Sequence, residues 1–208
     1  SVFKQLSKTF IVVLNDADEA AYLYNDLKHL LSENQIYLFP TSYRKSIKLS
    51  RYDAANEILR TEVLNQIINI NAPSIVVCYP ESLLEKVVSA SGLKNQTLKI
   101  KTGDTIGIDF LVEVLNEFGF ERVDFVYEPG QFSVRGSIVD IFSFSFELPF
   151  RCDFFGDEVD SIRIFDIETQ LSKEKRSEVE IIPDLLKDNK TQRENFFSLL
   201  KSDTLLVF

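Results

Sequence analysis

The sequence predicts an α/β protein in which a parallel-sheet domain is interrupted by a smaller α+β domain rich in antiparallel strands. Three observations lead to this prediction. In residues 1–88, short apolar runs alternate with segments of helical periodicity, as in parallel sheets covered by helices. Residues 131–171 are the densest run of β-branched and aromatic residues and alternate with a period of two, which is typical of antiparallel strands. The composition changes after Val88, where a polar loop begins.

The first domain contains three expected strands, each followed by a helix. The strands are expected at residues 10–14, 36–39 and 74–79, and the helices at residues 17–31, 53–70 and 83–88. Asp16 is a suitable N-cap for the first helix, and Pro80 suits the first turn of the third. Because strands and helices alternate, the strands are expected to form a parallel sheet.

The inserted domain is expected to begin with a loop at residues 89–95 and an exposed strand at residues 96–101. Asp104 or Thr105 is expected to cap a helix that runs to Phe118 and stops at Gly119. The apolar face of this helix would cover the antiparallel strands that follow.

One of these strands, residues 150–155, has an apolar and a mixed face. Phe150, Cys152 and Phe154 share the first face, and Arg151, Asp153 and Phe155 share the second. Gly156-Asp157 then interrupts the pattern as a hairpin turn does. Arg151 and Phe155 are therefore expected on one side of the sheet.

The last part of the chain is expected to return to the first domain. Val179–Ile182 and Thr204–Val207 resemble strands, and a helix is expected near residues 193–200. The predicted domains are residues 1–88 with 175–208, and residues 89–174.

Composition restricts the function. The net charge is −9, and residues 86–171 contain 8 Lys and Arg against 15 Asp and Glu. Such an acidic module repels a phosphate backbone, so a protein partner fits better than autonomous nucleic-acid binding. No apolar run is long enough to span a membrane and no signal peptide is evident, which favours the cytoplasm. The absence of methionine suggests a segment of a longer protein.

Catalytic motifs are missing from these 208 residues. There is no phosphate-binding G-x-x-x-x-G-K-[ST] loop, no G-x-S-x-G and no metal-spaced cluster. Cys78 and Cys152 lie in apolar strands and are expected to be buried, reduced thiols. His29 is expected to be solvated near a helix end. The segment is therefore expected to have no catalytic, metal or cofactor site.

The mixed face of the sheet allows two interpretations. In the first, Arg135 and Arg151 pair with nearby carboxylates and Phe155 packs under a loop. The candidate carboxylates are Asp140, Glu147 and Asp153. In the second, the arginines and the phenyl ring form a protein-binding patch, since interface hot spots are rich in such residues.

The strings SVRGSIVDIF and ELPFRCDFFGDEVDSIRIFDIETQ resemble a module shared by the excision-repair protein UvrB and bacterial transcription-repair coupling factors. The resemblance implies a degenerate helicase-like first domain and an inserted domain that binds UvrA through Arg135, Arg151 and Phe155. UvrB-like proteins carry a long tyrosine-rich hairpin after the second strand, whereas residues 39–53 form only a short loop here. This difference favours the coupling factors.

The resemblance also implies properties of a full-length parent. A coupling factor would bind RNA polymerase and double-stranded DNA elsewhere, use ATP and Mg²⁺ to translocate, and mask the UvrA-binding face with its carboxy-terminal region. The alternatives are a fragment of UvrB, the ATP-dependent damage-verification protein, and an acidic structural module without a specific partner.

Overall fold

The computed structural model describes residues 8–31, 35–44, 51–52, 54–70, 72–185 and 192–208. The chain divides into two compact units, residues 1–94 with 190–208 and residues 95–189. The expected division lay at residues 88/89 and 174/175, so the second unit is longer than expected at its carboxyl end. No helix in the described ranges has the length and hydropathy needed to cross a membrane.

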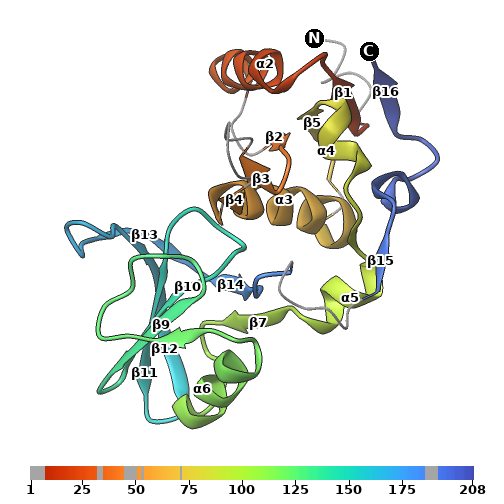
Figure 1. Ribbon diagram of the computed structural model, residues 1–208. Coiled ribbons are helices and arrows are strands. Elements are labelled where there is room, and N and C mark those ends of the chain that lie inside the picture. Colours follow the sequence, from red (N-terminus) through yellow and green to blue (C-terminus); the bar gives the residue numbers. More distant parts are fainter. Residues whose placement is uncertain (1–7, 32–34, 45–50, 53, 71, 186–191) are drawn as a thin grey trace. The chain divides into compact units, whose positions relative to one another are not determined.

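The first unit is built on a four-stranded parallel sheet in the order β16–β1–β5–β2, which confirms the predicted parallel sheet (Figure 1). Its strands are β1 (Phe10–Val13), β2 (Ile36–Phe39), β5 (Ile75–Cys78) and β16 (Leu205–Val207). Its helices are α2 (Ala17–Leu30), α3 (Ala54–Asn65), the π-helix η2 (Gln66–Ile70), α4 (Pro80–Leu84), α5 (Ala90–Asn95) and the 3₁₀ helix η3 (Phe196–Leu199). Its short strand pairs are β3 (Tyr43–Arg44) with β4 (Arg51–Tyr52), and β6 (Val87–Val88) with β15 (Arg193–Glu194).

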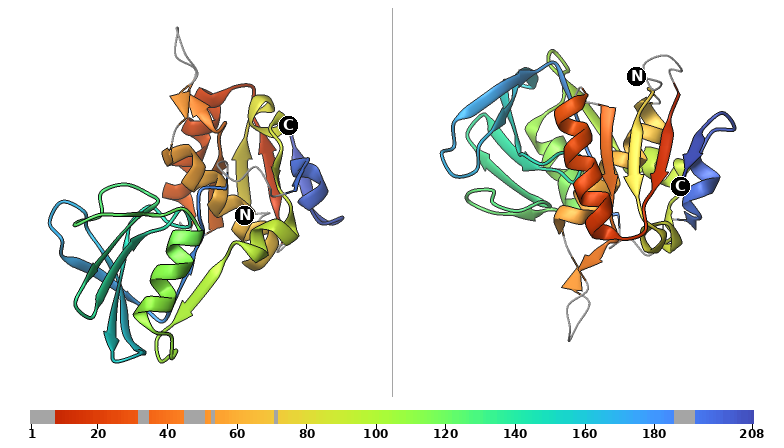
Figure 2. Two further views of the ribbon diagram at one scale, coloured as in Figure 1. Left: turned by 60° about the horizontal axis from the view of Figure 1, so that its bottom comes forward. Right: turned by 90° about the horizontal axis from the view of Figure 1, so that it is seen from above.

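The burial of each element in this unit follows from its position in the sheet. All four residues of β5 are buried, because β5 lies between β1 and β2. Helix α2 lies against β2 and β5 (Figure 2), with Ala20 fully buried in the contact. The side chain of Asp16 accepts a hydrogen bond from the Glu19 amide at 2.9 Å, as expected of an N-cap.

Several local expectations for this unit were wrong. Helix α4 ends at Leu84, and residues 87–88 form β6 instead of the end of a helix. Strand β6 pairs with β15, whose residues 193–194 were also expected to be helical. Residues 90–95, expected as a loop, form α5. Residues 39–53 include the β3–β4 pair, whereas residues 45–50 and 53 lie outside the described residues.

The second unit contains a six-stranded sheet in the order β13–β12–β11–β10–β9–β8, antiparallel except between β8 and β9. Its elements are β7 (Leu98–Lys101), α6 (Ile108–Glu117), β8 (Glu121–Arg122), β9 (Gln131–Arg135), β10 (Ile138–Phe142), β11 (Phe150–Phe155), β12 (Glu158–Phe165), β13 (Ser172–Arg176) and β14 (Glu178–Ile181). Helix α6 lies against one face of this sheet (Figure 2), and its Leu111 and Leu115 are fully buried there.

Strand β14 belongs to this second unit, not to the first as expected. It pairs antiparallel with β7, and Lys99 bridges Glu178 and Glu180 at 3.2 Å each. The start of α6 also differs from the expectation, because the Asp104 carboxylate accepts from the Lys101 amide and Gly107 is the N-cap. The β14–β7 pairing joins segments far apart in sequence, whereas the contact between Asp104 and Lys101 is local.

Candidate protein-binding surface

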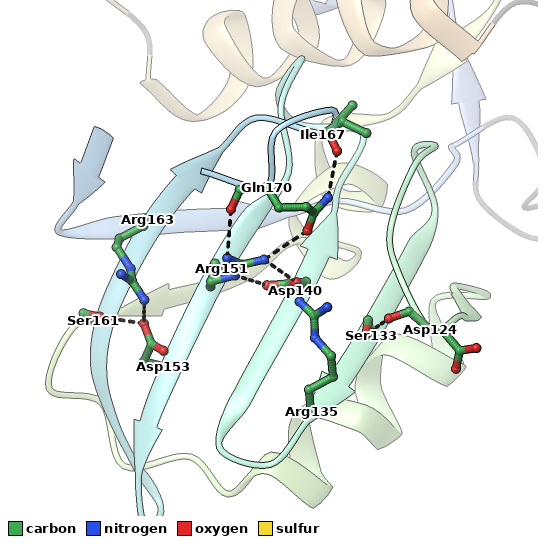
Figure 3. A network of polar contacts seen from close by, with 10 residues as sticks. All are labelled: Asp124, Ser133, Arg135, Asp140, Arg151, Asp153, Ser161, Arg163, Ile167 and Gln170. Atoms are coloured by element: carbon green, nitrogen blue, oxygen red, sulfur yellow. Dashed lines mark hydrogen bonds and ion pairs between the residues drawn. The ribbon is translucent and has the colours of Figure 1, made fainter. Parts of the chain in front are cut away.

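Strands β9 to β12 carry a core face and a polar face. Side chains on the core face are buried against α6 and include Phe132, Val139, Phe150, Cys152, Phe154 and Ile162. The polar face carries Ser133, Arg135, Asp140, Arg151, Asp153, Ser161 and Arg163, and Figure 3 shows it from close by. The predicted alternation along β11 is confirmed by its burial pattern, in which Phe150, Cys152 and Phe154 are buried and Arg151, Asp153 and Phe155 are not.

Asp140 is the centre of the polar face. Its side chain is 1% exposed, and it lies directly opposite Arg151 in the β10–β11 register. The Arg151 guanidinium donates through Nε to Oδ1 at 2.7 Å and through Nη2 to Oδ2 at 2.9 Å. Arg135 donates through Nη2 to the same Oδ2 (Figure 3). Two arginines from two strands therefore share one buried carboxylate.

Arg151 is held on several sides. Its guanidinium lies 4.3 Å from the ring centre of Phe165 and donates to the main-chain and side-chain oxygens of Gln170, at 3.3 Å each. Gln170 itself adopts a positive φ of 59°. Hydrogen bonding to Asp140 raises the pKa of Arg151 above its usual value. Only 14% of the Arg151 side chain is exposed, so most of it is unavailable to a partner.

Arg135 and Phe155 are more accessible. The Arg135 side chain is 36% exposed, and its guanidinium lies 4.8 Å from the ring centre of Phe125. Phe155, at the end of β11, is 84% exposed. Single exposed apolar side chains are common on protein surfaces, so the interest of Phe155 lies in its position on the same face as Arg135 and Arg151.

A second ion pair lies beside the first. Arg163 donates through Nη2 to Asp153, whose Oδ2 also accepts from the Ser161 hydroxyl at 2.9 Å. The strand register places Arg151 opposite Arg163, and Arg163 opposite Lys175. Like charges directly opposite each other destabilise a sheet, so Asp140 and Asp153 offset this row of cations.

The structure confirms one part of the first interpretation of the mixed face and contradicts another, whereas the protein-binding patch stays a prediction. The arginines pair with a carboxylate as the first interpretation expected, and the carboxylate is Asp140. Phe155 does not pack under a loop, contrary to the first interpretation. The roles of Phe125 and Gln170 were missed, because no local pattern connects these loop residues to strand arginines.

The first unit contains a separate cavity of about 550 Å³ at the carboxyl ends of β1, β2 and β5. Its described lining residues are Asp16, Ala17, Asp18, Thr41, Tyr43, Asn56, Tyr79 and Glu81. Thr41 and Tyr79 are hydrogen-bonded to each other, since the Thr41 amide donates to the Tyr79 hydroxyl at 2.9 Å. The described lining includes three carboxylates, those of Asp16, Asp18 and Glu81.

Comparison with known proteins identifies relatives of the chain. Residues 98–185 match the UvrB interaction domain family. The transcription-repair-coupling factor of Bacillus subtilis (strain 168) is 31% identical over 179 residues, which cover 86% of this chain and 15% of that protein. The one from Haemophilus influenzae is 31% identical over 88% of this chain and 16% of that protein. The one from Escherichia coli (strain K12) is 34% identical over 52% of this chain and 10% of that protein. The chain thus corresponds to 10–16% of the length of these relatives.

Proposed function

Because residues 98–185 belong to the UvrB interaction domain family and most of the chain is homologous to part of transcription-repair-coupling factors, we propose that it is a docking module for the excision-repair protein UvrA. The observation that carries the proposal is Phe155, a phenyl ring 84% exposed on the polar face of the sheet within the matched region. Hot spots combine such a ring, which fills a pocket, with arginines that bind carboxylates.

The proposal places the remaining activities in other parts of a full-length coupling factor. There we place ATP and Mg²⁺ use, DNA translocation, and binding of RNA polymerase and double-stranded DNA. In this proposal the segment is non-catalytic, works in the cytoplasm, recruits UvrA to lesions marked by stalled RNA polymerase, and has a degenerate helicase-like first unit. The parent's carboxy-terminal region would mask the polar face. The proposal is supported by the length of the relatives, most of which lies outside the aligned region.

A titration of UvrA from the same organism with the Phe155→Ala variant tests the docking function. Truncation of a hot-spot ring costs about 2 kcal/mol, so we expect roughly thirtyfold weaker binding. Because the ring is exposed, the thermal midpoint should hardly change. Phe110→Ala is the matched control, since Phe110 is a half-exposed phenylalanine on α6, which covers the other face of the sheet.

Two results would contradict the proposal. Wild-type chain that is folded but does not bind UvrA would remove the docking function, and equal losses in both phenylalanine variants would remove the assigned surface. ATP hydrolysis by the purified chain would instead favour the alternative, a fragment of UvrB.

A further inference from the structure

Asp140 is a buried carboxylate whose burial depends on its partners. Its side chain is 1% exposed in the middle of the sheet. A carboxylate removed from water is costly unless charged donors satisfy it. Three N–H groups from Arg135 and Arg151 do so here. The same bonds that satisfy Asp140 therefore bring two guanidinium groups close together.

The two arginines come from different strands and would repel each other without this carboxylate. Arg151 is directly opposite Asp140, and Arg135 is diagonal to it, two residues along β9 from Ser133, which faces Asp140. The three residues together carry a charge of +1. The phenyl rings of Phe165 and Phe125 each lie against one guanidinium and further limit its orientation.

The remaining donors of this pair suit a carboxylate. A guanidinium has five N–H donors in a planar fork, and Arg135 uses one of them on Asp140. The excess positive charge and the exposed Phe155 nearby on the same face favour an acidic side chain beside an apolar pocket.

We propose that Asp140 is a positioning residue, which holds the more exposed Arg135 beside the largely buried Arg151, so that Arg135 is a preformed receptor for a carboxylate of UvrA. The proposal rests on the docking function proposed above. Asp140 itself stays buried and acts on the partner only through Arg135, while Arg151 adds positive charge beside it. The energetic benefit is that the arginine side chains lose little conformational freedom on binding, because folding has already ordered them.

Removal of the Asp140 charge separates this proposal from simple electrostatics. Asp140→Asn makes the polar face more positive, so a purely electrostatic effect would strengthen binding to an acidic partner. Loss of positioning would weaken binding. The direction of the change therefore distinguishes the two effects.

The test is a titration of UvrA with wild-type chain, Asp140→Asn and Asp153→Asn. Asp153 is the matched control, because it also pairs with one arginine on this face and its substitution changes the charge equally. We expect binding at least tenfold weaker for Asp140→Asn and within twofold of wild type for Asp153→Asn. Unchanged or tighter binding by folded Asp140→Asn would overturn the proposal, as would equal losses in both variants.

Arginine side-chain NMR of the wild-type chain gives a second readout that does not depend on UvrA or on how well Asp140→Asn folds. The guanidinium groups of Arg135 and Arg151 should rotate slowly about their Nε–Cζ bonds. Arg122, on the exposed strand β8, should rotate freely. Free rotation of Arg135 would show that Asp140 does not hold it. If wild-type chain fails to bind UvrA, the docking function is overturned, and these spectra still decide whether Asp140 holds the arginines.

Discussion

Arg151 illustrates how one residue connects several parts of the sheet. It forms a two-bond fork with Asp140, lies over Phe165 and donates to Gln170. These contacts join β11 to β10 and to the turn after β12. An alanine at this position would remove most of the charge that offsets buried Asp140.

We therefore expect Arg151→Ala to lower the free energy of unfolding by about 3 kcal/mol, in the range found when one partner of a buried ion pair is removed. Arg135 still offsets part of the Asp140 charge and prevents a larger loss. Urea denaturation measures the change. Lys173→Ala, which breaks an exposed ion pair with Asp166 in the same sheet region, should shift the midpoint far less. Equal shifts would mean that the Asp140 pair adds no particular stability.

At the scale of elements, two tight hairpin turns determine which residues lie opposite each other on the polar face. The turns Gly136-Ser137 and Gly156-Asp157 connect β9 to β10 and β11 to β12, and in each the glycine has a positive φ, 61° and 63°. A glycine first in a two-residue turn matches the right-handed twist of the strands. These turns fix the register that places Arg135 diagonal to Asp140.

Gly136→Ala should cost about 1 kcal/mol of stability, because an L-residue is strained at a positive φ. A Cβ added there meets no atom within 4 Å, so the cost is conformational and not steric. Ser137→Ala, at the exposed second position of the same turn, serves as the control and should change stability little. Thermal denaturation of the two variants checks the difference, and equal midpoints would show that the turn tolerates alanine.

At the scale of the molecule, the two units have separate hydrophobic clusters. Each unit contains one buried cysteine, Cys78 in the first and Cys152 in the second. Burial raises the pKa of the thiols of Cys78 and Cys152 to about 12. Both thiols therefore stay protonated and unreactive in the folded chain at pH 8. Their contribution to stability is complete below the pKa of an unfolded thiol and is lost as the pH rises toward 12.

The two thiols should report on the two units independently. We expect a thiol reagent at pH 8 to label each cysteine only after its own unit opens, at different urea concentrations. Arg151→Ala should make Cys152 reactive at lower urea and leave the Cys78 profile unchanged. Mass spectrometry of the labelled peptides separates the sites. Joint labelling at one midpoint, shifted together in the variant, would mean that the units unfold as one.

The sequence by itself determined the elements whose signals are local. Continuous apolar runs indicated the parallel strands β1, β2 and β5, because strands covered on both faces need apolar residues throughout. The period of two along β11 placed Arg151 and Phe155 on the same face, since successive side chains of a strand point in opposite directions.

Only the tertiary structure decided the pairings between distant segments. It selected Asp140 over Glu147 and Asp153 as the carboxylate shared by both arginines, and it paired β14 with β7. It also turned residues 90–95 into a helix. Local patterns do not contain such choices, because they depend on which strand lies opposite which and on how deeply each side chain is buried once the sheet has formed.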